Sequence, residues 1–113
     1  MEKYYHKLVR DYIPKIIEDD GEIVITRVLE DEEYRNELYR KLLEESNEVI
    51  SAENPESILE ELADVLEVVR AIAELDGFQF EDIVDTAHHK QLKRGGFKNR
   101  VFLEKSFRQD NLW

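Results

Sequence analysis

Apolar residues recur every three or four positions through most of the chain, which is the spacing of amphipathic helices. Two long segments show this most clearly, one from Asp31 to about Ala52 and one from Pro55 to about Asp76. Asn54 and Pro55 form a start signal for the second, because Asn caps a helix N-terminus and Pro suits the first turn. A further helix is predicted from about Phe80 to Arg94, where two glycines end it.

The first segment, Tyr5–Asp20, also has a helical pattern that Gly21 closes, although Pro14 would break it unless the helix starts near that residue. Glu22–Leu29 is rich in β-branched residues, which favours an extended conformation. We therefore predict an all-α antiparallel bundle of about four helices, forming one domain over residues 1–113. The tail carries apolar residues that are expected to dock on the body of the protein or on a second subunit: Phe97, Phe102, Leu103, Phe107, Leu112 and Trp113.

Carboxylates lie at or within the apolar stripes of the two long helices. Glu61 falls inside its stripe and Asp64 just off the edge, while Glu45 borders the other stripe with Glu48 beside it. Antiparallel packing of the two stripes would bring these four carboxylates together. Four partly buried like charges are unfavourable without a counterion, so we expect a divalent cation among them. Oxygen ligands and the absence of cysteine favour Mg²⁺ or Mn²⁺ over zinc.

A plainer interpretation of these acids is that they are solvated neighbours on exposed faces, since Asp and Glu make up 27 of the 113 residues. A di-iron carboxylate bundle is disfavoured, because it requires Glu-x-x-His, and neither His88 nor His89 follows a Glu at that spacing. Adjacent residues on a helix point about 100° apart, so the two histidines are not expected to share an ion.

The charge is negative overall, at −11, and unevenly distributed. Residues 1–89 carry 25 acidic and 9 basic residues, whereas residues 90–113 carry 7 basic and 2 acidic ones. The acidic balance argues against general binding of nucleic acids or anionic membranes. The basic segment suits an anionic ligand, and its candidate phosphate-binding residues are Lys90, Lys93, Arg94, Lys98 and Asn99. Two further candidates lie in the N-terminal region, Lys7 and Arg10.

Four of the basic candidates have a structural alternative. Lys93 and Arg94 suit the negative end of a helix dipole, and Lys7 and Arg10 are equally suited to surface pairing with Asp11 or Glu2. Seven aromatic residues are candidates for stacking on a base, with packing in the core the preferred expectation for each: Tyr4, Tyr5, Tyr12, Tyr34, Tyr39, Phe78 and Phe80. No apolar run approaches the roughly 20 residues of a membrane span, and no signal-peptide pattern is present. A cytoplasmic location is expected.

Three sequence blocks resemble known motifs. Glu44-Glu45-Ser46-Asn47-Glu48, followed after 12 residues by Glu61-Leu62-Ala63-Asp64, resembles the EExxE…ExxD signature of the MazG-like all-α nucleoside triphosphate pyrophosphohydrolases. Residues 7–17 (KLVRDYIPKII) and residues 93–97 (KRGGF) resemble the opening and the ending of a phosphoribosyl-ATP pyrophosphohydrolase-like subgroup.

The resemblance implies Mg²⁺-dependent hydrolysis of a nucleotide between the α and β phosphates, in a house-cleaning role, by a homodimer or homotetramer. It implies that Glu45, Glu48, Glu61 and Asp64 hold the metal. It also implies that Glu44 and Glu45 act in catalysis, with Glu44 reaching a second metal or orienting the attacking water. Two alternatives stay open: phosphoribosyl-ATP pyrophosphohydrolase of histidine synthesis, and a non-catalytic helical module that binds a nucleotide or a metal.

Overall fold

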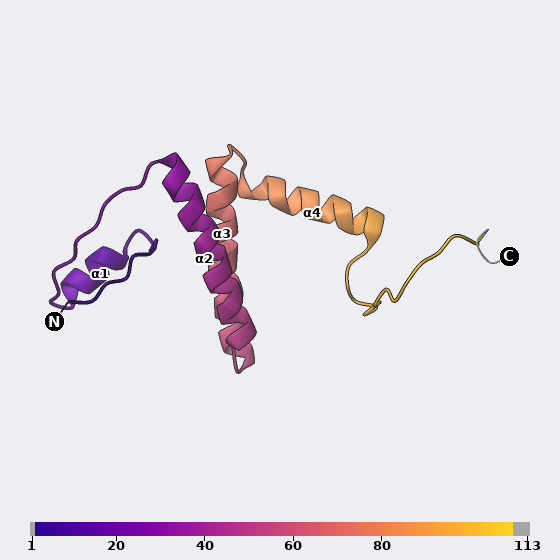
Figure 1. Cartoon of the computed structure of the whole chain (residues 1–113), viewed down its shortest axis with the longest axis horizontal. Coiled ribbons are helices and arrows are strands. Elements are labelled where there is room, and N and C mark those ends of the chain that lie inside the picture. Colours follow the sequence, from indigo (N-terminus) through magenta and orange to yellow (C-terminus); the bar gives the residue numbers. More distant parts are fainter. Residues whose placement is uncertain (1, 110–113) are drawn as a thin grey trace. The chain divides into compact units, whose positions relative to one another are not determined.

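The computed structural model describes residues 2–109, and in that range it contains four helices and no strand. The helices are α1 (Ile13–Asp19), α2 (Asp31–Ser51), α3 (Pro55–Leu75) and α4 (Phe80–Arg94) (Figure 1). The predicted all-α class is confirmed, and α2, α3 and α4 begin and end within a residue or two of their predicted bounds. The chain divides into one unit that ends at Phe80 and a second that begins at Glu81. Leu112 and Trp113 lie outside the described residues.

Helices α2 and α3 pack side by side as an antiparallel pair (Figure 1). The connection between them is short because Asn54 caps α3, its Oδ1 accepting a hydrogen bond from the Ser57 N–H at 2.9 Å, with Pro55 in the first turn. The core of the pair consists of Leu38, which is 2% exposed, together with Val68 and Ala73. Removing these side chains from water stabilises the pair and thereby fixes which helix faces meet.

An ion pair joins the other end of the two helices. The Arg35 guanidinium donates to both carboxylate oxygens of Asp76, and the Nη1–Oδ2 distance is 3.1 Å. Arg35 lies near the start of α2, and Asp76 follows the last residue of α3, so this contact requires the antiparallel arrangement. Gly77 then ends α3 in a left-handed conformation with φ of 85°, which glycine adopts without strain.

The first helix is shorter than predicted. It begins at Ile13 rather than Tyr5, with Pro14 in its first turn. Proline lacks a backbone N–H and collides with the preceding turn, so it is tolerated at a helix start and not in the interior. Residues 2–12 therefore form an irregular segment, the N-terminal arm.

The β-branched segment Glu22–Leu29 forms no strand. Ile23, Ile25 and Val28 are almost completely exposed. A preference of residues for β-structure reflects packing against neighbouring strands, and the described part of the chain offers this segment no such neighbour. Its composition alone therefore does not produce a sheet.

The expectation that the aromatic residues pack in the core is wrong for five of the seven. The exposed ones are Tyr4, Tyr5, Tyr12, Tyr39 and Phe78. Tyr34 and Phe80 are half-buried, and the Arg70 guanidinium lies 4.3 Å from the centre of the Phe80 ring. The reason is that one pair of helices encloses a narrow core, which a few aliphatic side chains already fill.

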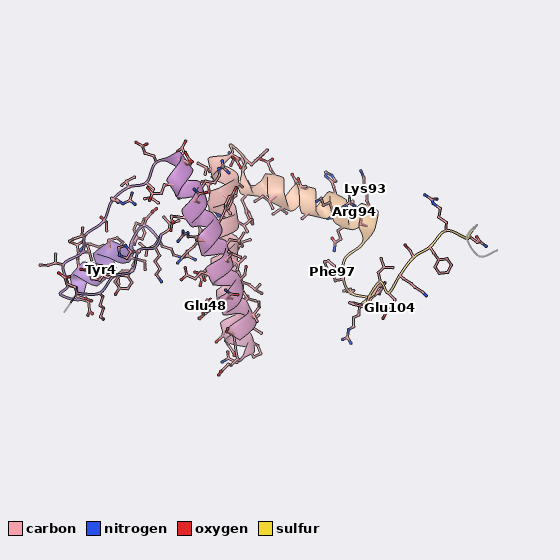
Figure 2. The ribbon with its side chains drawn as sticks, viewed as in Figure 1. Tyr4, Glu48, Lys93, Arg94, Phe97 and Glu104 are labelled. Atoms are coloured by element: carbon pink, nitrogen blue, oxygen red, sulfur yellow. The ribbon has the colours of Figure 1, made fainter. Side chains whose placement is uncertain are left out.

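The second unit contains nearly all of α4 and the basic segment. Lys93 and Arg94 occupy the last turn of α4 (Figure 2), where positive charge is favourable next to the unpaired carbonyl groups. The Gly95 N–H donates to the Gln91 carbonyl oxygen at 2.8 Å and closes the helix. Across residues 2–109 none of the helices has the length and apolar character that a membrane span requires.

Candidate functional site

Three of the predicted carboxylates meet where α2 faces α3. Glu45 of α2 and Glu61 and Asp64 of α3 each place one oxygen so that the three oxygens lie within 4.8 Å of one another. All three residues are half-buried. We call this group the three-carboxylate cluster. It forms because Glu61 lies within the apolar stripe of α3 and Glu45 borders that of α2, so packing of the stripes carries both acids inward.

Glu48 is exposed and lies outside this group, on the next turn of α2 (Figure 2). Its charge nevertheless acts on the cluster. Partial desolvation, and after it the negative charges of Glu48, Asp64 and Glu45, raise the pKa of Glu61. Among the described residues no cation pairs with Glu61. The site therefore holds more negative charge than its neighbours compensate.

Two basic residues of the N-terminal arm form ion pairs with acidic residues, one on α2 and one on α3. Arg10 Nη2 donates to Asp64 Oδ1 at 2.7 Å, and Lys7 Nζ donates to Glu44 Oε1 at 3.3 Å. The alternative expectation, pairing of Lys7 and Arg10 with Glu2 or Asp11, is therefore wrong. Because one contact reaches α2 and the other reaches α3, the arm spans the acidic edge of the helix pair.

Lys41 is part of the site and was not among the residues predicted from the sequence. Its Nζ lies 3.2 Å from Glu44 Oε2 and 3.5 Å from Glu45 Oε1. The spacing KLLEE contained the signal, since a lysine three and four residues before two glutamates lies on the same helix face. Burial acts to raise the pKa of Glu44, but the hydrogen bonds and charges of Lys41 and Lys7 outweigh it and lower that pKa.

The donor set fits a hard divalent cation. Three carboxylates supply oxygen ligands from two rigid helices, and Mg²⁺ and Mn²⁺ prefer such oxygen ligands. A bound cation would also relieve the repulsion that, after partial desolvation, raises the pKa of Glu61. The remaining basic and amide candidates belong to the second unit, where they are exposed: Lys90, Lys93, Arg94, Lys98 and Asn99.

Comparison with known proteins gives one match. Residues 34–96, more than half of the chain, match the family described as the MazG nucleotide pyrophosphohydrolase domain. No curated protein and no solved structure matches the chain. The matched range contains the three-carboxylate cluster, Glu44, Lys41 and the basic end of α4, whereas the N-terminal arm lies outside it.

Proposed function

Because the chain belongs to the MazG nucleotide pyrophosphohydrolase domain family, we propose that it hydrolyses a nucleoside triphosphate or a related nucleotide to the monophosphate and pyrophosphate, with Mg²⁺ or Mn²⁺ as cofactor. The observation that carries the proposal is the convergence of Glu45, Glu61 and Asp64 from two helices inside the matched range. We assign the chain to the phosphoribosyl-ATP pyrophosphohydrolase-like subgroup and to a house-cleaning role, in which non-standard or damaged nucleotides are removed.

The reaction needs charge neutralisation and alignment more than covalent participation by the protein. Glu45, Glu61 and Asp64, with Glu48 beside them, would hold the metal ion. When bound, that ion supplies neutralisation of the phosphate charge and a lower pKa for the attacking water. The water oxygen forms a bond to the α-phosphorus and gives up a proton to a nearby carboxylate. The bond from that phosphorus to the bridging oxygen breaks, and pyrophosphate leaves with the bridging oxygen.

Glu44 is proposed as the residue that orients the attacking water. Both of its oxygens already accept hydrogen bonds from lysines, so the carboxylate is charged and has a defined direction. A charged carboxylate next to the metal ligands accepts a hydrogen bond from water and thereby directs the water oxygen to phosphorus. Glu45 is proposed to act both as a metal ligand and as part of this catalytic pair.

Basic residues are proposed to bind the phosphates. Arg10 is a candidate because its guanidinium already contacts Asp64, one of the proposed metal ligands. The second unit contributes the other candidates: Lys90, Lys93, Arg94 and Asn99. Guanidinium and ammonium groups form the stronger, charge-assisted hydrogen bonds with phosphate oxygens.

We also propose that the enzyme, a single domain over residues 1–113, is a homodimer or homotetramer in the cytoplasm, with no nucleic-acid or membrane partner. Apolar side chains along the α2–α3 pair support the assembly, because they remain substantially exposed: Leu43, Ile50, Leu59, Leu62 and Leu66. An open groove on α3 runs beside the last three of these. Covering such a surface with a second copy removes it from water.

The test is to incubate the purified chain with Mg²⁺, a panel of standard and damaged nucleoside triphosphates and phosphoribosyl-ATP in ¹⁸O-labelled water. The expected products are a monophosphate carrying the label and unlabelled pyrophosphate, because the water attacks the α-phosphorus. Orthophosphate as the first product, or label in the pyrophosphate, would contradict the proposal. Mg²⁺-dependent nucleotide binding without any product would instead identify a non-catalytic binding module.

A further inference from the structure

Lys41 differs from the other lysines and arginines of α2 in its surroundings. Its side chain is only 16% exposed, and its ammonium group contacts two carboxylates at once. Arg40, the adjacent residue, is 79% exposed and pairs with Glu37 on the preceding turn at 3.5 Å. A lysine side chain normally keeps its charged end in water. The partial burial of Lys41 therefore indicates that its position is determined by its two partners.

The two partners of Lys41 have different surroundings. Glu45 belongs to the three-carboxylate cluster, and its side chain is 13% exposed. Glu44 lies outside the cluster, and its two oxygens are divided between Lys7 and Lys41. Among the described residues, Lys41 is thus the one whose ion pairs join Glu44 to a member of the cluster.

This arrangement has an electrostatic consequence. Lys41 lies between the Glu44 and Glu45 carboxylates, so without its charge the two like charges would face each other and one Glu44 oxygen would lose its partner. With one oxygen on Lys41 and the other on Lys7, turning toward the cluster would break two ion pairs. At the same time the positive charge of Lys41 competes with a metal ion for Glu45.

We propose that Lys41 is a positioning residue, whose ammonium group fixes the direction of the Glu44 carboxylate and keeps it outside the metal-binding cluster, so that Glu44 orients the attacking water. The inference rests on the proposed function, since it assigns Lys41 a part in that reaction. It predicts that substitution of Lys41 changes the reaction rate and the metal affinity in opposite directions. Removal of the Lys41 charge slows the chemical step and strengthens metal binding, whereas a structural defect would weaken both.

The experiment compares K41M, K41R and R40M in the full-length protein. For K41M we expect kcat to fall about 10- to 100-fold, the range for loss of a hydrogen bond between charged groups, with little change in KM. We expect Mn²⁺ to bind about two- to fivefold more tightly, because K41M removes the ammonium group that competes with the metal ion for Glu45, and a partly exposed ion pair contributes little. Electron paramagnetic resonance of Mn²⁺ measures this affinity. K41R keeps the charge and should recover part of kcat.

R40M is the matched control, because it removes a positive charge from the adjacent residue without touching Glu44 or Glu45. Its kcat and Mn²⁺ affinity are expected to equal those of the unmodified protein. An unchanged kcat in K41M, no recovery in K41R, or weaker Mn²⁺ binding together with lost helicity by circular dichroism would each overturn the role of Lys41. If the unmodified protein released no pyrophosphate, the proposed function would fail by itself, and the Mn²⁺ comparison would still decide whether Lys41 competes for Glu45.

Discussion

The α2–α3 pair and the unit that begins at Glu81 are both helical and both rich in charged residues, but they use charge differently. In the pair, acidic residues next to apolar stripes are carried into the interface and converge in the three-carboxylate cluster. In the second unit, Ile83 is the one residue through position 109 that is not exposed, and the basic residues of α4 stand on an open surface. Acidic residues next to an apolar stripe therefore converge in one site when their helix packs against another helix.

The two regions also differ in the apolar content of their helices. α3 carries a continuous stripe that buries Val68 and Ala73 against α2. α4 carries fewer and more widely spaced apolar residues, and Val84 and Leu92 remain exposed. Apolar burial is the main force that orients one helix against another.

The largest expected effect is that of Glu61→Gln, which tests whether the α2–α3 pair contains the catalytic site. Removing one charged ligand from the three-carboxylate cluster is expected to lower kcat/KM by at least about 100-fold and to weaken Mn²⁺ binding. Glu67→Gln is the control, because Glu67 lies on the same helix and pairs with Arg70 at 3.6 Å, away from the cluster. Pyrophosphate release by Glu61→Gln near the rate of the unmodified protein would remove the cluster from the mechanism.

The next largest effect concerns stability. Leu38→Ala empties a position that is 2% exposed at the centre of the pair, and it is expected to lower the free energy of unfolding by about 2–5 kcal/mol. Leu92→Ala in α4 is expected to change it by less than about 0.5 kcal/mol, since that side chain is exposed. Urea unfolding measures both. An equal loss for Leu92→Ala would show that α4 packs against a partner in solution, which would contradict the exposed position of its side chains.

The helix pair and its cluster were largely predictable, whereas the surroundings of the cluster were not. The positions of Glu45, Glu61 and Asp64 follow from the helical period and from antiparallel packing, which are local properties of the sequence. The pairing of Arg10 with Asp64 joins residues 54 positions apart, and no periodicity relates an irregular arm to a helix face. Lys41 was predictable in principle, but a lysine near glutamates is common in a chain with this many acids.

The irregular segments show a second limit of the sequence pattern. Tyr5–Tyr12 has apolar spacing compatible with a helix, yet the helix begins only at Ile13 because Pro14 suits a first turn. Glu22–Leu29 has the composition of a strand and forms none, because strand formation needs a neighbouring strand. Propensity describes what a segment prefers in a suitable environment, and the environment is set by the rest of the fold.

A smaller effect, on KM rather than on kcat, would sharpen the role of the second unit. Lys93→Gln removes a proposed phosphate ligand and is expected to raise KM for the nucleotide about tenfold, the lower end of the range for a charge-assisted hydrogen bond. Lys105→Gln removes the same charge from the tail, where Lys105 lies 5.9 Å from the centre of the Phe107 ring. If both substitutions raise KM equally, the unit acts through its overall positive charge and not through a ligand at the end of α4.

The smallest expected effect is a change in the pH dependence of stability of the metal-free protein. Partial desolvation and the neighbouring carboxylates raise the pKa of Glu61, so the folded state holds the Glu61 proton to higher pH than the unfolded state does. Stability linked to this residue therefore falls as pH rises from the ordinary glutamate pKa through the raised pKa of Glu61. Glu61→Gln, which cannot ionise, should lack that fall and have a slightly higher Tm near neutral pH.

Metal binding should reverse the order of the two Tm values, so that the unmodified protein becomes more stable than Glu61→Gln. The reason is that the unmodified protein has both the repulsion that a cation removes and the Glu61 carboxylate that binds the cation. With Mn²⁺ added at neutral pH, the Tm of the unmodified protein is expected to rise, and that of Glu61→Gln to rise less. Thermal unfolding by circular dichroism, with and without Mn²⁺ and with Glu67→Gln as control, measures the crossover. A Tm for metal-free Glu61→Gln below that of the unmodified protein would mean that Glu61 stabilises the helix pair by itself, and the cluster would then be a structural network rather than a cation site.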